Sequence, residues 1–526
     1  MKNPLHQHTD KLHTHEQHIH GQHAQTNAEA THSIPPKRPW HSIRPEEYRH
    51  LIRPFFLLAF LYVLGISAIL RANFNYIDDL GRVAQGYKDW DGFSRYLSNF
   101  LSTFLHTDQY LTDVSPLPQL VSAFLLSAAG MIILSVLGSQ KKISLWEIIA
   151  LIPLGLSPYF LECISYKYDS PYMALSILAS VFPLLFYKRG ALIYGTISIL
   201  GILTVCTTYQ PAAGIYPMLV ILVSLQFWNQ NANLQKILKF ISISAASYLI
   251  GMMAFRFLLM RPVDNYVSGS LPPLPKLIPQ TLEHFKTYFL LVNSDFKKEW
   301  MIFLILMAIA FVLLTVRDSR QKKWLAFFLS GAALIAMALL SFGIYPLLEN
   351  PLYAPRAMYG FGVFVALMGV SIARAKRAYA AKMICFCLSW CLFVFSFTYG
   401  NALSAQKNYT DFRIELAIAD LNTSMPSPEE GEKTVQIAGS IGFAPVINHM
   451  PIYYQSLLHR LVPVLFQEEW DWGIYQFYNY YGLRNVRLNR TVDLTEKNLP
   501  VLKDTMYHTI RGKGNNVLIE LKPSNP

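Results

Sequence analysis

The chain reads Pro54-Phe-Phe-Leu-Leu-Ala-Phe-Leu-Tyr-Val-Leu-Gly-Ile-Ser-Ala-Ile-Leu70 and continues directly as Arg71-Ala-Asn-Phe-Asn-Tyr-Ile-Asp78-Asp79. The first segment is an apolar run that approaches the roughly 20 residues needed by a membrane-spanning helix. Asp78 and Asp79 therefore follow where the chain is expected to leave the membrane, close to the headgroups, which makes them candidates for chemistry on lipid-linked substrates. The alternative is that the pair caps the helix expected through Tyr87, because Asp is favoured near helix N-termini.

The composition indicates a polytopic membrane protein. Of the 526 residues, 52% are hydrophobic and 15% are charged, whereas soluble domains carry roughly 25% charged residues. The net charge of +12 does not indicate a nucleic-acid partner, because the Lys and Arg residues gather in short gaps between apolar runs, as topology signals do. The five cysteines lie in or beside apolar segments, so neither a disulfide framework nor a CxxC metal site is expected.

Apolar runs recur along the chain and predict about eleven spans in a mainly α-helical bundle embedded in membrane lipids. Several runs are shorter than the ideal length, which tilt or local thinning of the bilayer accommodates. The runs lie at about 52–70, 118–138, 145–161, 172–187, 190–207, 211–228, 240–259, 300–316, 324–345, 357–373 and 383–400.

The gaps between these runs alternate in their content of Lys and Arg, which predicts the orientation. Five short gaps, at 141–142, 188–189, 236–239, 317–323 and 374–382, are basic and are expected on the cytoplasmic side with the N-terminus. The C-terminal region then faces outward, because the number of spans is odd. The other outward gaps are 71–117, 162–171, 208–211, 260–299 and 346–356.

The chain divides into three predicted regions. Residues 1–50 form a polar, His-rich cytoplasmic tail that is expected to be disordered, with transition-metal binding as the alternative. Residues 51–400 form the transmembrane bundle. Residues 401–526 change in composition and predict a small α/β domain outside the cytoplasm. Its expected elements are a polar helix at 411–421, a turn-rich linker at 424–431 and strands at 434–440, 485–488 and 516–521.

Two of the outward gaps carry structure of their own. In the 71–117 loop, apolar residues from Trp90 to Leu105 recur at helical spacing, which predicts an amphipathic helix lying in the membrane interface. The alternative is a helix packed on the bundle without lipid contact. The 260–299 loop has a Pro-rich portion and then an amphipathic stretch at 281–292, and we expect it to fold over a substrate cavity as a lid or re-entrant element.

Ionisable groups near membrane depth are costly, so those beside the spans are functional candidates. Arginine binds phosphate, tyrosine flanks sugar faces, and Asp accepts the proton of an attacking hydroxyl. Each candidate has a structural alternative: Glu162 or Asp169 pairs with Lys167 or caps a helix, and Arg356 snorkels to the membrane surface. With Asp78 and Asp79, the residues expected to line one outer cavity are Glu162, Tyr166, Asp169, Gln210, Arg256, Arg261 and Arg356.

Three short motifs and the overall layout carry a resemblance to a known family. The motifs are Asn75-Tyr-Ile-Asp-Asp79 after the first span, Ser165-Tyr-Lys-Tyr-Asp-Ser-Pro171 after the third and Thr208-Tyr-Gln-Pro211 after the fifth. With them, the chain resembles the bacterial and phage-encoded type II O-antigen glucosyltransferases of the GT-C superfamily, whose members use polyprenyl-phosphate sugars. The resemblance covers approximately residues 50–400, and the His-rich N-terminus lies outside it.

The resemblance implies transfer of a hexosyl group, expected to be glucosyl, from undecaprenyl phosphate to a surface glycan such as O-antigen, on the periplasmic side of a bacterial inner membrane. An acidic residue of the first outer loop is the base or the acceptor-orienting group in GT-C enzymes, which maps to Asp78 or Asp79 without deciding between them. Some relatives use a divalent metal; we expect no required cofactor and no metal site. Arg356, with Arg256 or Arg261, is expected at the departing phosphate, and sugar or acceptor contacts are expected from Glu162, Tyr166, Asp169 and Gln210.

Two other functional classes remain open. A transporter or flippase of lipid-linked sugar is favoured by internal repeats or by charges buried mid-span. Here no clear repeat is found, and the charges gather at one expected face. A non-catalytic membrane protein that binds glycan or a partner is the third class, and it predicts an unchanged surface glycan when Asp78 and Asp79 are replaced.

Overall fold

The computed structural model describes residues 45–138, 142–261, 270–424, 433–449, 452–468 and 498–523, together with residues 477, 481–483, 486–488 and 493–495. The chain separates into two units, Met1–Glu47 and Tyr48–Pro526. The second unit is described below. Most of the His-rich tail, with its expected disorder and its metal-binding alternative, lies outside the described residues, as does most of the expected 424–431 linker.

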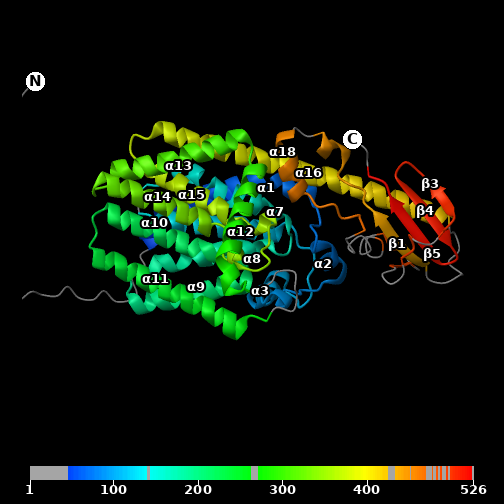
Figure 1. Ribbon diagram of the computed structural model, residues 1–526, viewed down its shortest axis with the longest axis horizontal. Helices are drawn as coiled ribbons and strands as arrows, with labels where there is room; N and C mark the ends of the chain where they lie inside the picture. Colours follow the sequence, from blue (N-terminus) through cyan, green and yellow to red (C-terminus); the bar gives the residue numbers. More distant parts are fainter. Residues whose placement is uncertain are drawn as a thin grey trace, which may run out of the picture. The chain divides into compact units, whose positions relative to one another are not determined.

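The described residues between 45 and 424 are mainly helical and form the bundle in Figure 1. Its longer helices are α1 (Pro45–Ala72), α4 (Leu117–Val136), α8 (Ser170–Val181), α9 (Ala191–Thr208), α10 (Ile215–Asn229), α11 (Leu234–Ala254), α12 (Leu274–Asp295), α13 (Lys298–Asp318), α14 (Lys323–Leu340), α15 (Gly360–Arg374) and α16 (Tyr379–Ser424). The shorter elements are α2 (Asp79–Gln85), η1 (Asp91–Phe93), α3 (Tyr96–His106), α5 (Leu145–Ala150), α6 (Ile152–Leu156), α7 (Pro158–Ser165), η2 (Phe182–Phe186), η3 (Gln210–Gly214), η4 (Phe255–Leu259), η5 (Tyr345–Leu347) and η6 (Pro355–Ala357).

Among the described residues, eight helices are long and apolar enough to cross a membrane. The pair Leu145–Leu156 and Pro158–Ser165 adds a ninth if it is one span, bent by 56°. The bend follows from Pro158, because proline forces the preceding Ser157 into an extended conformation, with ψ at 146°. Two shorter apolar helices, Ser170–Phe186 and Gly360–Arg374, match the remaining expected runs. A polytopic helical membrane protein is therefore confirmed, and the count of eleven spans stays a prediction.

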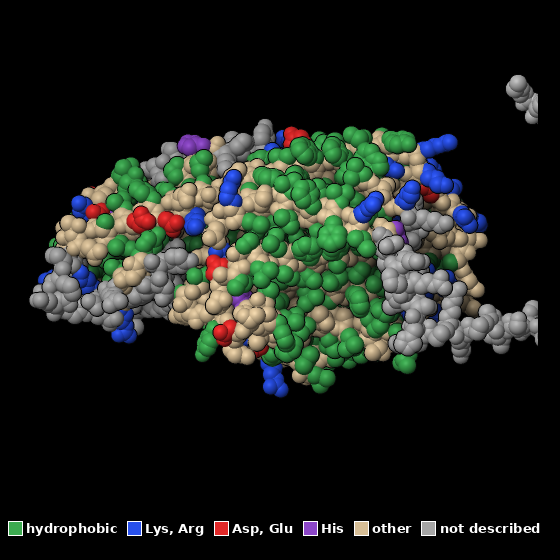
Figure 2. Space-filling view, turned by 180° about the vertical axis from the view of Figure 1, so that it is seen from behind, with side chains coloured by type: hydrophobic (Ala, Val, Ile, Leu, Met, Phe, Trp, Pro, Cys, Tyr) green, Lys and Arg blue, Asp and Glu red, His purple; other side chains and the backbone are tan. Residues whose placement is uncertain are grey.

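The basic gaps between the spans meet at one end of the bundle. Arg317 Nη2 donates to the backbone oxygen of Lys376 at 2.8 Å, and the backbone N–H of Arg320 donates to the oxygen of Asn229 at 2.9 Å. Figure 2 shows hydrophobic side chains over the middle of the bundle, with Lys and Arg gathered at the end away from the sheet. Gaps far apart in the sequence are thus on the same side, as the alternation predicts, whereas the cytoplasmic assignment of that side stays a prediction.

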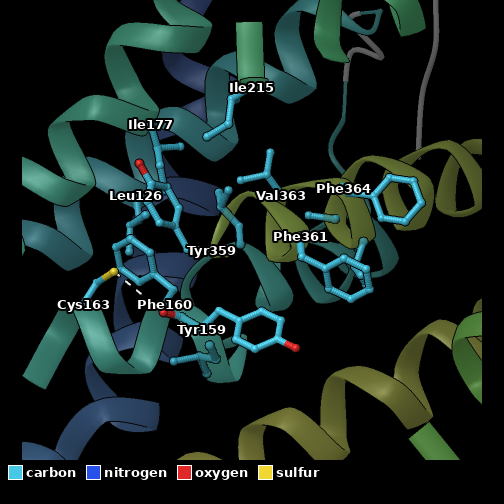
Figure 3. Close-up of a cluster of buried hydrophobic side chains, with 14 of the residues drawn as sticks. Leu126, Tyr159, Phe160, Cys163, Ile177, Ile215, Tyr359, Phe361, Val363 and Phe364 are labelled. Atoms are coloured by element: carbon cyan, nitrogen blue, oxygen red, sulfur yellow. Dashed lines mark hydrogen bonds between the residues drawn. The ribbon is translucent and has the colours of Figure 1, made fainter. Parts of the chain in front are cut away.

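Aromatic side chains fill the centre of the bundle (Figure 3). The ring of Tyr159 meets Phe361 edge to face at 6.1 Å, and Phe160 meets Tyr359 at 5.7 Å in the same manner. Such pairs add about 0.5–1.5 kcal/mol each beyond the burial of their area. They join α7 to the start of α15, and so fix the gap at the end of α7 relative to the gap that precedes α15.

Helices α1 and α16 approach each other closely at Gly400. A Cβ atom at this position would lie 2.5 Å from the backbone carbon of Ala68 and 2.6 Å from the nitrogen of Ile69. Only glycine permits this approach, because any side chain would collide with the backbone of α1. The contact fixes the last turns of α1, from which the Asp78–Asp79 loop emerges.

Helix α3 places its aromatic residues on the outside of the molecule. Ser98, Ser102 and His106 form its buried face, whereas Phe100 is 60% exposed and Phe104 is 64% exposed. Phe100 and Phe104 are therefore not packed on the bundle, whereas Leu101 packs against the buried Trp90 and Tyr172. The two exposed rings favour the interfacial interpretation of this helix. The amphipathic stretch expected at 281–292 lies within α12, which is longer; its role as a lid stays a prediction.

Helix α16 is a single helix of 46 residues that runs from the bundle to the sheet (Figure 1). The polar helix expected at 411–421 is its last part, and it packs Ile414, Ala417 and Leu421 against the sheet. The buried Arg413 holds the two together, because its Nη2 donates to the oxygen of Lys522 at 2.7 Å. The helix crosses residue 400 without a break, and the domain boundary expected there stays a prediction.

The C-terminal sheet is mixed, with strand order β2-β1-β5-β4-β3. Strand β1 is parallel to β2 and to β5, with Val435 opposite Val517, and β4 is antiparallel to β3 and β5. The sequence predicts β1, β2 and β5; β3 and β4 form a hairpin that it does not predict. The strands are β1 (Lys433–Gly439), β2 (Val486–Leu488), β3 (Val501–Asp504), β4 (His508–Lys513) and β5 (Asn516–Leu521).

Two helices between β1 and β2 return to the bundle. They are α17 (Pro445–Asn448) and α18 (Ile452–Leu461). Leu457, Leu458 and Leu461 are buried in the same hydrophobic core as the membrane helices. The C-terminal region therefore contributes to the bundle as well as forming a sheet.

Candidate functional site

The loop between α1 and α2 is strained on both sides of Tyr76. Asn73 has φ at 44° and Ile77 has φ at 47°. A β-branched residue is rare in this left-handed region, and such strain costs roughly 1–3 kcal/mol and gathers at functional sites. The strained Ile77 comes immediately before the two adjacent carboxylates.

Asp79 is fully buried and holds this loop together. Its Oδ2 accepts hydrogen bonds from the backbone N–H of Tyr76 at 3.1 Å and of Lys167 at 2.9 Å. Its Oδ1 has no partner among the described residues. Burial raises the pKa of Asp79 to about 8, against the opposing effects of Arg82 and the Lys167 N–H. Asp79 therefore holds the loop before α2 to the backbone at Lys167; neither hydrogen bond caps α2, because both N–H groups lie outside that helix.

Asp78 has the opposite surroundings. It occupies the N-cap position of α2, yet its side chain makes no capping hydrogen bond, and it is partly exposed. Burial raises the pKa of Asp78, while the nearby guanidinium groups of Arg82, Arg356 and Arg95 oppose the rise. Asp78 is thus a partly exposed carboxylate near three cations, and it makes no capping hydrogen bond within the part of the chain that the structure describes.

Arg82 forms a buried ion pair with Asp169, which begins α8. The second oxygen of Asp169 accepts a hydrogen bond from Trp90 Nε1 at 2.6 Å, and the guanidinium of Arg82 lies 4.6 Å from the centre of the Trp90 ring. A buried charge needs such complete pairing, because an unpaired one is costly. Both oxygens of Asp169 are occupied, so its side chain acts here by holding Arg82.

Glu162, at the end of α7, holds Arg356 in the loop before α15. Its Oε1 lies 2.9 Å from Arg356 Nη1, and its Oε2 accepts the backbone N–H of Arg356. The guanidinium lies 5.5 Å from the centre of the Tyr166 ring, which in turn meets Tyr76 edge to face at 4.7 Å. Arg356 is 18% exposed and Glu162 only 2%, so the cation faces outward from a buried carboxylate.

Gln210 connects the first outward gap to the end of α9. Its Nε2 donates to the backbone oxygen of Phe93 at 2.9 Å, and its Oε1 accepts from Arg95 Nε at 3.2 Å. Arg95 also lies over the ring of Tyr209, 4.6 Å from its centre. The guanidinium of Arg95 is thereby fixed between two gaps that are more than a hundred residues apart.

A cavity of about 360 Å³ adjoins this arrangement. Its polar lining includes Arg95, Gln210 and Arg256, and its walls are mainly apolar side chains of α11, η4 and η5, including Met252 and Leu347. Of the nine residues expected to line one outer cavity, Gln210 and Arg256 line this one. Its lining does not include the other seven: Asp78, Asp79, Glu162, Tyr166, Asp169, Arg261 and Arg356. Arg261 bonds through its backbone N–H to Ser94 Oγ at 2.8 Å and has an exposed side chain.

A second, more polar cavity of about 230 Å³ lies beside the same loop, between it and α16. Lys167 lines it, with its Nζ bonded to Asn75 at 2.7 Å and to Asp113 at 2.9 Å. Lys167 therefore pairs with neither Glu162 nor Asp169, so the expected ion pair between Lys167 and one of these carboxylates is wrong. Glu162 pairs with Arg356 and Asp169 with Arg82 instead. The remaining lining residues are Asn73, Phe74, Leu80, Lys407, Thr410, Asp411, Leu465 and Tyr481.

The C-terminal region contacts the loop between α1 and α2 at Tyr76. The hydroxyl of Tyr76 donates to the backbone oxygen of Leu461, at the end of α18, at 2.7 Å. The hydroxyl of Tyr399 donates to the same oxygen at 3.2 Å. Tyr76 and Leu461, which are 385 positions apart, therefore belong to one hydrogen-bond network with Asp79, which accepts the backbone N–H of Tyr76.

Four residues of this network are absent from the expected set: Tyr76, Arg82, Trp90 and Arg95. Arg82 carries a usable signal, because it follows Asp78 by four residues and so shares its helix face. The others carry no signal of their own, since aromatic and basic residues are common in interfacial loops. Among the residues that the structure describes, no group of three or more His, Cys, Asp or Glu is placed to hold a metal ion.

Comparison with known proteins gives two matches. A family profile described as "Glucosyl transferase GtrII" matches residues 67–367, more than half of the chain. A 55.3 kDa protein of Salmonella phage P22, itself described as uncharacterized and encoded in the gtrB 5' region, is 24% identical over 437 residues, which cover 78% of this chain and 87% of that protein. No solved structure matches.

Proposed function

Because the chain belongs to the GtrII glucosyl transferase family, we propose that it transfers a glucosyl group from a polyprenyl phosphate to a surface glycan such as O-antigen, at the outer face of a bacterial inner membrane. The observation that carries this proposal is the Asp78 carboxylate, which makes no capping hydrogen bond and lies near enough to Arg82, Arg95 and Arg356 for their charges to act on its pKa. A base beside several fixed cations is what glycosyl transfer from a phosphate needs.

Asp78 is the proposed general base. The acceptor hydroxyl attacks the anomeric carbon and gives its proton to Asp78 as the new C–O bond forms. The bond between the anomeric carbon and the phosphate oxygen breaks, and the electron pair leaves with the lipid phosphate. Burial shifts the pKa of Asp78 upward, in the direction of the working pH, and a shift in that direction makes a carboxylate a better base. Asp79 is the proposed positioning residue.

The departing phosphate is assigned to Arg356 and Arg95. Glu162 and Gln210 hold these two guanidinium groups in place before substrate binds. Preorganised cations stabilise developing charge without paying for reorganisation during the reaction. Arg356 keeps the role expected from the sequence, and Arg95 takes the second position, which was expected to belong to Arg256 or Arg261.

The two cavities suit two different substrates. The 360 Å³ cavity has apolar walls and a few polar groups, as expected for a lipid chain with an anionic head. Its neighbours Phe257 and Leu258 are 76% and 72% exposed, so lipid can reach it from the membrane. The polar cavity lined by Lys167 and Asp411 is assigned to the glycan acceptor, which is rich in hydroxyl groups.

The test is transfer by the purified full chain, reconstituted in lipid and supplied with radiolabelled polyprenyl-phosphate glucose and isolated glycan. Asp78→Asn is expected to lower the rate by about 10²- to 10⁴-fold, the usual worth of a general base. Asp79→Asn is the matched variant and is expected to retain far more activity. Wild-type rates in Asp78→Asn would overturn the role of Asp78, and movement of the lipid-linked sugar across the bilayer without transfer would favour the transporter class.

A further inference from the structure

A third cavity lies at the other end of the bundle, where the basic gaps meet. Its volume is about 260 Å³. It lies between the ends of α10, α13 and α15, with apolar walls that include Leu222, Phe311 and Ile372. None of the candidate catalytic or substrate-binding residues lines it, so the proposed glucosyl transfer gives it no role.

Two polar atoms at this cavity have no partner among the described residues. They are Arg374 Nη1 and Asn229 Oδ1, and both are buried. The rest of the Arg374 guanidinium is fixed, because Nε donates to Glu147 Oε1 at 2.8 Å and Nη2 donates to the oxygen of Leu134 at 2.6 Å. A buried donor or acceptor without a partner is costly, so this cavity has one donor and one acceptor for a ligand to satisfy.

The charge at the cavity favours an anion. Arg320 lines it with an exposed side chain, while its backbone N–H is bonded to Asn229. Among the described residues that line the cavity, the one carboxylate is Asp318, and it is paired with Arg317, whose Nε lies 2.7 Å from Asp318 Oδ1. Arg374 is likewise paired with Glu147, so Arg320 is the cation in excess.

We propose that this cavity binds the phosphodiester headgroup of an anionic membrane lipid, such as phosphatidylglycerol. Arg320 and Arg374 Nη1 bind the phosphate, and Asn229 Oδ1 accepts a hydrogen bond from a headgroup hydroxyl. The apolar walls contact the glycerol backbone and the first acyl carbons. Basic pockets between membrane helices bind anionic headgroups in this way. The bound lipid joins the ends of α10, α13 and α15.

The test is native mass spectrometry of the full chain with added phosphatidylglycerol or phosphatidylcholine. Arg320→Ala is expected to weaken phosphatidylglycerol retention about tenfold, the effect of losing one charge-assisted hydrogen bond. Asn229→Asp, nearly identical in shape, is expected to weaken it by a similar factor through repulsion. Arg189→Ala is the control, because Arg189 is an exposed cation outside the cavity. Thermal unfolding in phosphatidylcholine verifies that each variant is folded.

Equal retention by wild type, Arg320→Ala and Asn229→Asp would overturn the proposal. Displacement of phosphatidylglycerol by an equal concentration of inorganic phosphate would show a free-anion site and would also overturn it. Stronger Arg320-dependent retention of polyprenyl phosphate than of phosphatidylglycerol would instead assign the cavity to the donor lipid. None of these readouts depends on glucosyl transfer, so they are independent of the proposed function.

Discussion

Glu162 Oε1 lies 2.9 Å from Arg356 Nη1, and this ion pair joins two loops that are 194 positions apart in the sequence. The carboxylate is buried and also accepts the backbone N–H of Arg356. One side chain thus fixes both the direction of the guanidinium and the path of its loop. The predictions below follow from this pair and from the contacts around it.

Glu162→Gln is expected to lower transfer through Arg356. A glutamine keeps the shape but provides no charge for the guanidinium, so the preorganised position at the phosphate is lost. Arg356→Lys should have a similar effect, because lysine cannot make the same forked contact. The measurement is the transfer rate against donor concentration. Glu283→Gln, in an exposed pair with Lys286, is the control and should leave the rate unchanged.

Asp169→Asn is expected to destabilise the protein by roughly 3–5 kcal/mol, because it leaves Arg82 buried without its counter-ion. The measurement is thermal unfolding in detergent. Glu283→Gln is again the comparison variant. It breaks the exposed pair of Glu283 and Lys286, and breaking such a pair changes stability by about 0–1 kcal/mol. Equal losses in the two variants would contradict the assignment of Asp169 as a buried structural partner.

Stability is expected to fall as pH rises from about 4 to about 8, in part because of Asp79. Its pKa is raised from 3.8 to about 8 on folding, so the folded chain holds a proton in this window that the unfolded chain releases. The contribution of Asp79 to the free energy of unfolding falls by about 1.4 kcal/mol for each pH unit between the unfolded and folded pKa values, and it is fully lost above the folded pKa. The measurement is the melting temperature across this range.

Asp79→Asn cannot ionise and should lose less stability over the same pH range than the wild type. Asp78 and Asp295 also have raised pKa values. Both are present in the two proteins, so the difference between the two curves isolates residue 79. Parallel curves would show that Asp79 is ionised in the folded state.

Met252→Trp is expected to raise the donor concentration needed for half-maximal transfer, because the larger side chain fills part of the 360 Å³ cavity. Rates with saturating donor should change less. Met383→Trp, at an exposed position on α16, is the control for the substitution itself. An unchanged donor dependence in Met252→Trp would place the lipid elsewhere.

Several parts of this structure follow from the sequence because they depend on local pattern. The apolar run from Pro54 to Leu70 predicts a membrane helix wherever it is placed, since burial of its length needs no knowledge of its neighbours. The alternation of basic and polar gaps predicts which loops share an end of the bundle, and the hydrogen bonds between Arg317 and Lys376 agree with it. The strands β1 and β5 are also visible in their β-branched pattern.

Tertiary structure alone decided the roles within the site. Asp78 and Asp79 are adjacent and chemically identical in the sequence, and only packing buries one against the N–H of Lys167 and leaves the other partly exposed. Likewise, Asp169 pairs with Arg82 and not with the nearby Lys167. Pairing across gaps depends on how distant helices pack, and hydrophobic periodicity does not record that packing. The sequence therefore determined where the charged residues lie along the chain, and the fold determined which of them are buried and paired and which are left partly exposed.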